Sequence, residues 1–371
     1  MNRAVAIRFP RPPAAGPIAT LVLAAALATP LHAQVAVAPR RDYDSVAAAL
    51  TVPDRMPGPP PAAFLPLIGE YGSVGDVLYI LERDGKLDAL IGRSNLYPLA
   101  QVADSVFRFP DSGPYAGQQV VFARGPDGRV TSAAVAGVAY PRRAVGTEGG
   151  VTFHITPLKP VEELRRTALA MQPPVQPPGL RKPDLVDLTT LDPRIRLDIR
   201  YATSNDFMGA AMYTSAHAFL QRPAAEALRR AARWLERQGY GLLIHDAYRP
   251  WYVTRMFWDA TPDSLKIFVA DPAQGSHHNR GCAVDLTLYD LASGQPVDMV
   301  GGYDEFSPRS FADYPGGTSR QRWNRALLRR AMEAVGFTVY DAEWWHFDYR
   351  DWARYPVLNL TFEQLARRHD H

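Results

Sequence analysis

The chain has 371 residues, of which 47% are hydrophobic and 21% charged, which favours a globular protein of two domains over a disordered one. Its formal net charge is +3, and removing Arg3, Arg8 and Arg11 from the first 33 residues brings that charge to zero. The small positive charge therefore gives no support for a nucleic-acid partner. Cys282 is the only cysteine, which excludes an intramolecular disulfide.

Residues 1–33 have the pattern of a secretory signal peptide. A basic start precedes an apolar core at 18–28, and Leu31-His32-Ala33 resembles a cleavage site. The core is shorter than the roughly 20 apolar residues that cross a bilayer, so we expect no membrane span after signal cleavage. An uncleaved anchor or a cytosolic tail is the alternative. We expect an exported protein, periplasmic or secreted.

Residues 34–62 are rich in Ala and Pro and predict a tether, and residues 63–160 predict a small all-β domain. Asp84-Gly85 marks a tight hairpin turn inside that domain. The domain has no acid–histidine cluster, so we expect a spacer or packing domain rather than a binding or substrate-gating module. Its expected strands lie at 76–82, 87–91, 106–109, 119–123 and 130–140.

Residues 161–183 combine a short helix at 161–171 with a stiff proline-rich linker at 172–179. We expect residues 182–371 to fold without the β domain, because the linker precedes every chemical motif. Residues 184–371 predict an α+β catalytic domain, in which helices flank a small mixed or antiparallel sheet. Its expected strands lie at 197–203, 241–248, 282–289, 337–340 and 345–349, and its helices at 223–238, 318–335 and from Thr361 onward.

Two short motifs in this half carry residues that bind metals. Residues 276–285 offer an imidazole and a carboxylate seven positions apart, and residues 343–346 offer an acid and an imidazole three apart. Two imidazoles, one carboxylate and one open position make the ligand set of a catalytic zinc site, and the remaining acid can serve as a general base. The alternative is ordinary polar residues on turns, but the convergence of independent motifs favours the metal site.

The local pattern indicates how these residues meet. We expect Asp285 inside a strand and His278 on the loop before it, with Gly281 permitting the bend between them. Glu343 is expected in the bend between two strands. Cys282 lies between two candidate ligands, and we interpret it as a small packing residue.

At this point the chain resembles a known family. Ser-x-His-x-x-Gly-x-Ala-x-Asp (276–285) and Glu-x-Trp-His (343–346) resemble the zinc D-alanyl-D-alanine metallopeptidases. The doubled Trp and His-Asp-Ala-Tyr-Arg-Pro (245–250) are most similar to the D-alanyl-D-alanine dipeptidases of the vancomycin-resistance type. The resemblance covers about 185 to 350, half of the chain. It implies zinc-dependent hydrolysis of the D-Ala-D-Ala dipeptide.

The resemblance also implies roles for individual residues. It gives one Zn2+ per chain on His278, Asp285 and His346, with Glu343 as the general base and Arg249 stabilising the oxyanion. For Arg249 the alternative is a structural ion pair with a nearby acid.

Other positions near the motifs receive weaker assignments. Asp304 falls where the dipeptidases place the acid that meets the substrate's free amino group. Ser276 and Trp345 are candidate substrate contacts, with a loop cap and a core position as their alternatives. His277 is displaced by one from the ligand position, so we expect no ligand role for it. Asp246 is expected on the strand face opposite Arg249, in a structural role.

Three other functions stay open. The export signal favours a D,D-carboxypeptidase or a peptidoglycan endopeptidase of the same family, because cell-wall peptides lie outside the cytoplasm. A non-catalytic wall-binding protein is supported by the β domain alone, and the complete ligand set counts against it. In each case the expected partner is a small peptide or a cell-wall peptide, and the sequence does not indicate an oligomeric state.

Overall fold

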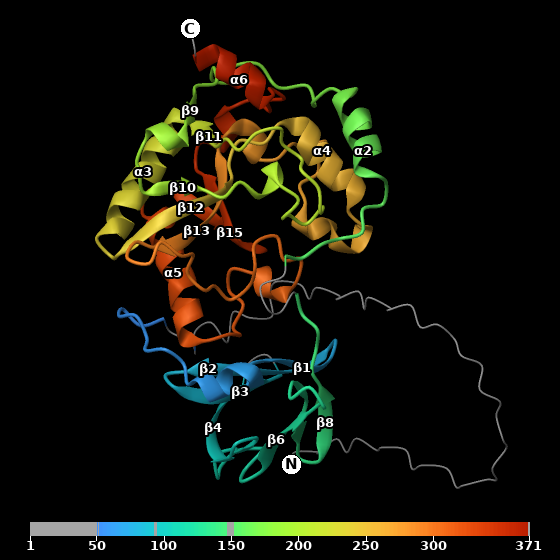
Figure 1. The fold of residues 1–371 in the computed structure, drawn as a ribbon, viewed down its shortest axis with the longest axis vertical. Helices are drawn as coiled ribbons and strands as arrows, with labels where there is room; N and C mark the ends of the chain where they lie inside the picture. The colour runs from blue at the N-terminus through green and yellow to red at the C-terminus, as the bar shows by residue number, and fades with distance from the viewer. Residues whose placement is uncertain (1–49, 51, 93–94, 147–151, 370–371) are drawn as a thin grey trace, which may run out of the picture. The chain divides into compact units, whose positions relative to one another are not determined.

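A computed structural model describes residues 50, 52–92, 95–146 and 152–369 of the chain (Figure 1). The expected signal peptide, and the expected tether up to residue 49, lie outside the described residues. Among the described residues, no helix has the length and apolar character needed to cross a membrane. The described part contains both helices and sheets, so the α+β class is confirmed.

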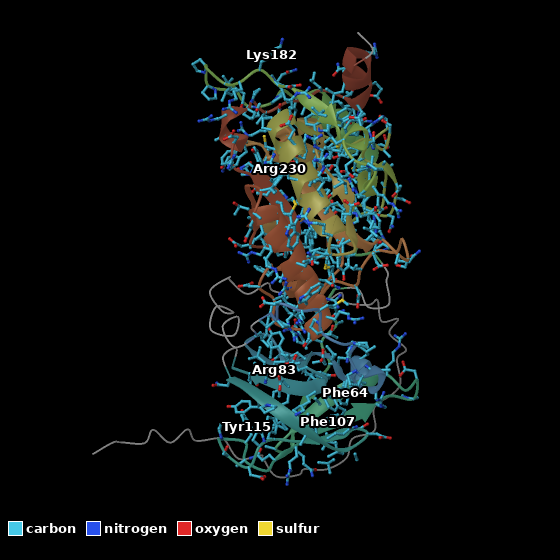
Figure 2. All side chains as sticks on the ribbon, turned by 90° about the vertical axis from the view of Figure 1, so that its left-hand side faces the viewer. Phe64, Arg83, Phe107, Tyr115, Lys182 and Arg230 are labelled. Carbon is cyan, nitrogen blue, oxygen red and sulfur yellow. The ribbon has the colours of Figure 1, made fainter. Side chains whose placement is uncertain are left out.

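The first sheet is antiparallel, and its eight strands follow one another in chain order. A short 3₁₀ helix, η2 (Ala62–Leu67), precedes it, and the ring of Phe64 meets that of Phe107 edge-on at 5.7 Å (Figure 2). The strands are β1 (Gly69–Ser73), β2 (Asp76–Arg83), β3 (Lys86–Ile91), β4 (Asn95–Ala103), β5 (Val106–Arg108), β6 (Gln119–Arg124), β7 (Val130–Val135) and β8 (Val138–Pro141).

The sequence predicted part of this sheet. The hairpin of β2 and β3 turns at Asp84 and Gly85, both at positive φ, as the turn chemistry predicts. The single strand expected at 130–140 is wrong, because Ala136 and Gly137 turn the chain back at positive φ and divide it into β7 and β8. Strands β1 and β4 were not predicted, since the glycines of β1 and the polar residues of β4 weaken the alternating pattern.

Strand β2 is buried on both faces. Tyr79 and Leu81, 2% and 0% exposed, belong to the same apolar cluster as the core of the second half of the chain. Leu78 and Ile80 point the other way and belong to a separate cluster inside the β sheet. Because alternate residues of a strand face opposite sides, β2 contributes to two cores at once.

Polar contacts join β2 to a helix near the end of the chain. The Glu82 carboxylate accepts a hydrogen bond from the backbone N–H of Ser319 at 2.8 Å, at the first turn of α5 (Ser319–Glu333). The Arg322 guanidinium donates to the Glu82 carbonyl at 2.6 Å, and burial lowers the pKa of Arg322 to about 10. A buried guanidinium needs such acceptors, so the first sheet supplies hydrogen-bond partners that the start of α5 requires.

These contacts change the expectation for the isolated second half. A fragment of residues 182–371 should unfold at a lower temperature than the full chain, or be insoluble, because it exposes the partners of Tyr79, Leu81 and Glu82. Thermal unfolding of both forms, followed by circular dichroism, measures the difference. A fragment that unfolds at the full-chain temperature and keeps full hydrolytic activity would restore the spacer interpretation.

The second sheet has five strands in the order β10-β12-β13-β15-β14. The pair β10–β12 is parallel and the other three pairs are antiparallel, which gives the small mixed sheet that the sequence predicts. Two further strands, β9 (Leu185–Asp187) and β11 (Phe219–Gln221), form a separate antiparallel pair. The five strands are β10 (Ile195–Leu197), β12 (Tyr240–Asp246), β13 (Ala283–Asp290), β14 (Phe337–Tyr340) and β15 (Glu343–Tyr349).

Helices α3 and α5 pack against this sheet and against each other (Figure 1). Thr318 caps α5 with a full capping box, and Thr361 and Gln364 exchange the same pair of bonds at the start of α6. The helices are α2 (Val161–Leu169), α3 (Arg222–Glu236), α4 (Trp251–Ala260), α5 and α6 (Phe362–His369).

Two expectations for this half need correction. The strand expected at 197–203 ends at Leu197, and Arg200–Ala202 form a 3₁₀ turn instead. Glu343 is not in the bend between strands, because it is the first residue of β15 and pairs with Tyr340 of β14. Both differences lie at strand ends, where long-range pairing rather than local pattern decides the boundary.

Candidate active site

Three expected metal ligands converge from two strands and one turn. Asp285 of β13 lies directly opposite His346 of β15 in the antiparallel ladder, so both side chains point to the same side of the sheet. His278 begins a 3₁₀ turn (His278–Arg280) that Gly281 ends at φ 65°. A Cβ at Gly281 would lie 2.5 Å from Leu185 Cδ2, so both the backbone conformation and the space require glycine there.

The distances among the three ligand atoms suit zinc. His278 Nε2 lies 3.1 Å from His346 Nδ1 and 3.3 Å from Asp285 Oδ1, and the His346–Asp285 distance is 3.0 Å. A tetrahedral zinc with bonds of roughly 2.0–2.1 Å to nitrogen and oxygen separates its ligand atoms by roughly 3.3 Å. The triangle therefore has the size of one face of a zinc coordination tetrahedron.

Hydrogen bonds on the far sides of the two imidazoles orient their lone pairs. His278 Nδ1 donates to the carbonyl of Ala247 at 2.6 Å, which leaves Nε2 as the acceptor. His346 Nε2 donates to Asp348 Oδ1 at 2.9 Å, which leaves Nδ1 as the acceptor. Two lone pairs and a carboxylate then face one point, an arrangement that calls for a cation.

The pKa shifts of Asp285 and His346 also favour a cation at this point. Burial works to raise the pKa of Asp285, but His278 and His346 outweigh it and hold that pKa well below its ordinary value. Burial works to lower the pKa of His346, but Asp348 and Asp285 raise it well above the ordinary value. Asp348 and Asp285 thus favour a proton on His346, and a metal ion that binds at Nδ1 of His346 would displace that proton.

Glu343 lies beside this triangle with a side chain that is 12% exposed. Its Oε2 is 3.9 Å from His346 Nδ1. Burial raises the pKa of Glu343 to about 8, and the nearby Asp285 adds to the effect. A carboxyl group that titrates near neutral pH can both accept and return a proton, as a general base must.

Arg249 enters the site from the segment after β12. Its Nε and Nη2 both donate to Asp246 Oδ2 at 2.8 Å, and Nη2 lies 3.7 Å from Asp285 Oδ2. Burial works against its charge, and Asp246 and its neighbours keep the pKa of Arg249 well above its ordinary value. The guanidinium is therefore a fixed positive charge at the edge of the ligand triangle.

The position expected for Asp246 is wrong. Strand β12 ends at Asp246, so alternation does not continue to Arg249, and an irregular register between Ile244 and Asp246 re-aims the side chain. Its carboxylate holds Arg249 and also accepts a hydrogen bond from Tyr213 at 2.7 Å. Asp246 is thus a partner of the site rather than a residue on the opposite face.

Asp304 reaches the same cavity, at φ 53° and with 5% of its surface exposed. Tyr201 donates a hydrogen bond to its Oδ2 at 2.7 Å. Burial and the Asp285 charge raise the pKa of Asp304 well above its ordinary value, against the opposing effect of Tyr201. A cation bound in the cavity would favour the ionised form of this carboxyl group.

The other two expected substrate contacts differ from each other. Ser276 lines the cavity, and its hydroxyl accepts a hydrogen bond from the His278 N–H at 3.2 Å, so it also caps the turn. Trp345 is 0% exposed and is not among the residues that line the cavity, which agrees with the alternative of a core position. Its ring packs edge-on against Tyr303 at 5.5 Å, and Tyr303 donates to Asp285 Oδ2 at 3.0 Å.

Sequence reasoning missed several residues of the site. Tyr201, Tyr303 and Asp348 were not predicted, although Asp348 lies two residues after His346 on one strand and so faces the same side. That spacing is a signal the sequence does contain. The two tyrosines carry no comparable signal, because neither belongs to one of the short motifs, and their partners lie 103 and 18 residues away along the chain.

The cavity that these groups line has a volume of about 230 Å³. This is below the roughly 300–1,000 Å³ of pockets for drug-sized ligands, so the cavity suits a small molecule. A larger cavity of about 860 Å³ is lined by none of the three ligands, Glu343, Arg249 or Asp304. The apolar part of the smaller cavity's wall consists of Phe207, Phe257, Ile267, Phe268, Val269 and Ala270.

Comparison with known proteins agrees with this geometry. A family model described as D-ala-D-ala dipeptidase, of the peptidase M15 group, matches residues 181–366. The chain belongs to this family. It is accordingly a hydrolase of a zinc metallopeptidase family, and the first sheet (β1–β8) lies outside the matched residues.

Three similar relatives carry the name D-alanyl-D-alanine dipeptidase. The one from Escherichia coli (strain K12) is 38% identical over 179 residues, which cover 48% of this chain and 91% of the relative. The one from Enterococcus faecium is 35% identical over 187 residues, covering 46% and 91%. The one from Streptomyces coelicolor is 33% identical over 175 residues, covering 42% and 87%.

Proposed function

We propose that the chain hydrolyses free D-Ala-D-Ala with one zinc ion held by His278, Asp285 and His346. The observation that carries this proposal is the convergence of three ligand atoms, 3.0 to 3.3 Å apart, beside Glu343 in a small cavity. The names of the relatives support the substrate. Bound zinc would supply a Lewis acid, which makes water a nucleophile near neutral pH and polarises the peptide carbonyl.

The side chains around the ligands supply the remaining chemistry. Glu343 accepts the proton of the attacking water and returns it to the leaving amine, because its carboxylate lies beside the proposed ligands, 3.9 Å from His346 Nδ1. Arg249 faces the oxyanion that forms at the carbonyl, and Asp246 holds its guanidinium in place. Ser276 lines the same cavity and is available to bind the substrate's polar groups.

Asp304 accounts for the preference for a free dipeptide. Its buried carboxyl group has a raised pKa and faces the cavity, so the substrate's ammonium group restores both its charge and its partner. A D,D-carboxypeptidase needs room at this position for the preceding residue of a longer peptide. The cavity volume of about 230 Å³ favours the shorter substrate.

A comparison of substrates tests the assignment. The wild-type protein should cleave D-Ala-D-Ala more than tenfold faster than N-acetyl-D-Ala-D-Ala, because loss of one member of a buried charge pair typically costs ~2–5 kcal/mol. Asp304→Asn should remove most of that preference by slowing only the free dipeptide, and asparagine tolerates the positive φ. Initial rates on both substrates and on a pentapeptide stem provide the measurement.

Asp263→Asn is the matched control, because the Asp263 side chain is 95% exposed and lies outside the cavity. It should leave both rates unchanged. Faster cleavage of the pentapeptide stem would assign a carboxypeptidase, and equal rates on free and acetylated dipeptide would remove the role given to Asp304.

We also propose that this hydrolysis takes place outside the cytoplasm. The support is the basic start and short apolar core at residues 1–33. The substrate would then come from reactions that release dipeptides from cell-wall material.

A further inference from the structure

His277, next to the ligand His278, occupies a defined place at the cavity. Its Nδ1 lies 2.7 Å from Asp348 Oδ1. The same carboxylate oxygen accepts the hydrogen bond from His346 Nε2 at 2.9 Å. Oδ1 of Asp348 therefore contacts two imidazoles, those of His346 and His277. His346 is a proposed zinc ligand, and His277 is the residue next to another one, His278.

The ring of His277 is held in place from two directions. It stacks on the indole of Trp352 with ring centres 3.8 Å apart and planes 21° from parallel. Its backbone carbonyl accepts hydrogen bonds from the N–H groups of Arg280 and Cys282, both at 3.1 Å, which fix it at the start of the 3₁₀ turn. The imidazole thus presents Nδ1 to Asp348 in one orientation.

We propose that His277 is a positioning residue of the metal centre, acting through Asp348 on the ring of His346. This inference rests on the proposed zinc site. The Asp348 side chain is 20% exposed, so water can compete for its oxygen and the carboxylate can turn away from His346. A second donor on the same oxygen holds the carboxylate in the position that keeps His346 Nδ1 directed at the metal.

His277 is not a ligand in this arrangement. Its Nδ1 is engaged by Asp348, and the compact group of metal-binding atoms among the described residues consists of His278, Asp285 and His346. The two adjacent histidines therefore have different roles. His278 is a proposed ligand, whereas His277 supports a different ligand, His346.

Zinc affinity, measured by competition with a chromophoric chelator, tests the proposal without relying on activity. Removing a hydrogen-bond partner of a metal ligand typically weakens metal binding by roughly 10–100-fold. Asp348→Ala should fall in that range, and His277→Ala should weaken binding by up to ~10-fold, because its effect is transmitted through Asp348. The double variant should bind zinc no more weakly than Asp348→Ala alone.

Two further substitutions separate hydrogen bonding from packing. His277→Phe keeps a ring on Trp352 but has no N–H to donate, so it should weaken zinc binding as much as His277→Ala. His277→Asn restores a donor near the Nδ1 position and should bind zinc almost as tightly as the wild type. His217→Ala is the control, because this histidine lies 3.9 Å from Asp187 and outside the cavity.

The outcomes are distinct. Wild-type affinity in His277→Ala, wild-type affinity in His277→Phe, or additive losses in the double variant would each overturn the positioning role. Failure of the wild-type protein to bind zinc at all would overturn the proposed function instead. If His277→Ala does not fold, the comparison of His277→Phe with His277→Asn still decides the proposal.

Discussion

Replacing Asp285 by Ala should reduce bound zinc from about one ion per chain to near zero and abolish hydrolysis. The expectation follows from the ligand triangle, in which Asp285 Oδ1 lies 3.0 Å from His346 Nδ1 and 3.3 Å from His278 Nε2. Two neutral imidazoles alone leave a catalytic zinc site one ligand short of the usual three. The same loss is expected for His278→Ala and His346→Ala.

Zinc content of the purified variants, measured by inductively coupled plasma mass spectrometry, checks this result. Asp290→Ala is the control, since Asp290 ends the same strand and makes its hydrogen bonds to the Ser293 turn, away from the cavity. It should keep the metal. A full complement of zinc in Asp285→Ala would show that the metal is bound elsewhere and would remove the basis of the mechanism.

Replacing Glu343 by Gln should have the opposite pattern, with zinc retained and turnover lost. Glu343 is beside the triangle and outside the set of three converging ligand atoms, so its substitution leaves that set intact. General-base catalysis typically contributes roughly 10²–10⁴-fold, and the loss in kcat should lie in that range. Steady-state hydrolysis of D-Ala-D-Ala and zinc content, measured on the same sample, give both values.

Glu333→Gln is the matched control for this substitution. Glu333 ends α5, is 40% exposed and pairs with Arg329 at 2.7 Å on the helix surface. It should change neither zinc content nor turnover. Near-wild-type kcat in Glu343→Gln would assign the base to another group, and loss of zinc from that variant would make Glu343 a ligand.

The convergence of His278, Asp285 and His346 could be predicted from sequence because each of them belongs to a short motif with fixed spacing. Asp285 and His346 lie opposite each other on adjacent strands, and His278 lies on a turn that immediately precedes one of those strands. Short motifs with fixed spacing encode such an arrangement directly. The same holds for the capping boxes at Thr318 and Thr361, which depend on residues three positions apart.

The supporting contacts could not be predicted in this way. Asp246 turns toward Arg249 because the register of β12 is irregular, and no periodicity in the sequence marks that irregularity. The bond from Tyr201 to Asp304 joins residues 103 positions apart. Trp345 follows the motif's pattern, but tertiary packing directs it into the core.

The burial of strand β2 on both faces could not be predicted from the sequence either. The run at 76–82 predicts a strand, but the same run does not reveal that both faces are covered by different cores. Continuous apolar character is compatible with one covered face or two. The contacts of Glu82 with Ser319 and Arg322, more than 230 residues away along the chain, identify the second partner.

Cys282 lies between two of the ligands along the chain, yet it is fully buried. Burial raises the pKa of its thiol to about 12, so almost none of it is the reactive thiolate near neutral pH. Thiol-reactive maleimide dyes and nitroxide spin labels should therefore not react with Cys282 in the native protein. A pair of cysteines introduced on the surfaces of β3 and α5 could then be labelled without background. The distance between the two labels would report in solution on the contact between the first sheet and α5.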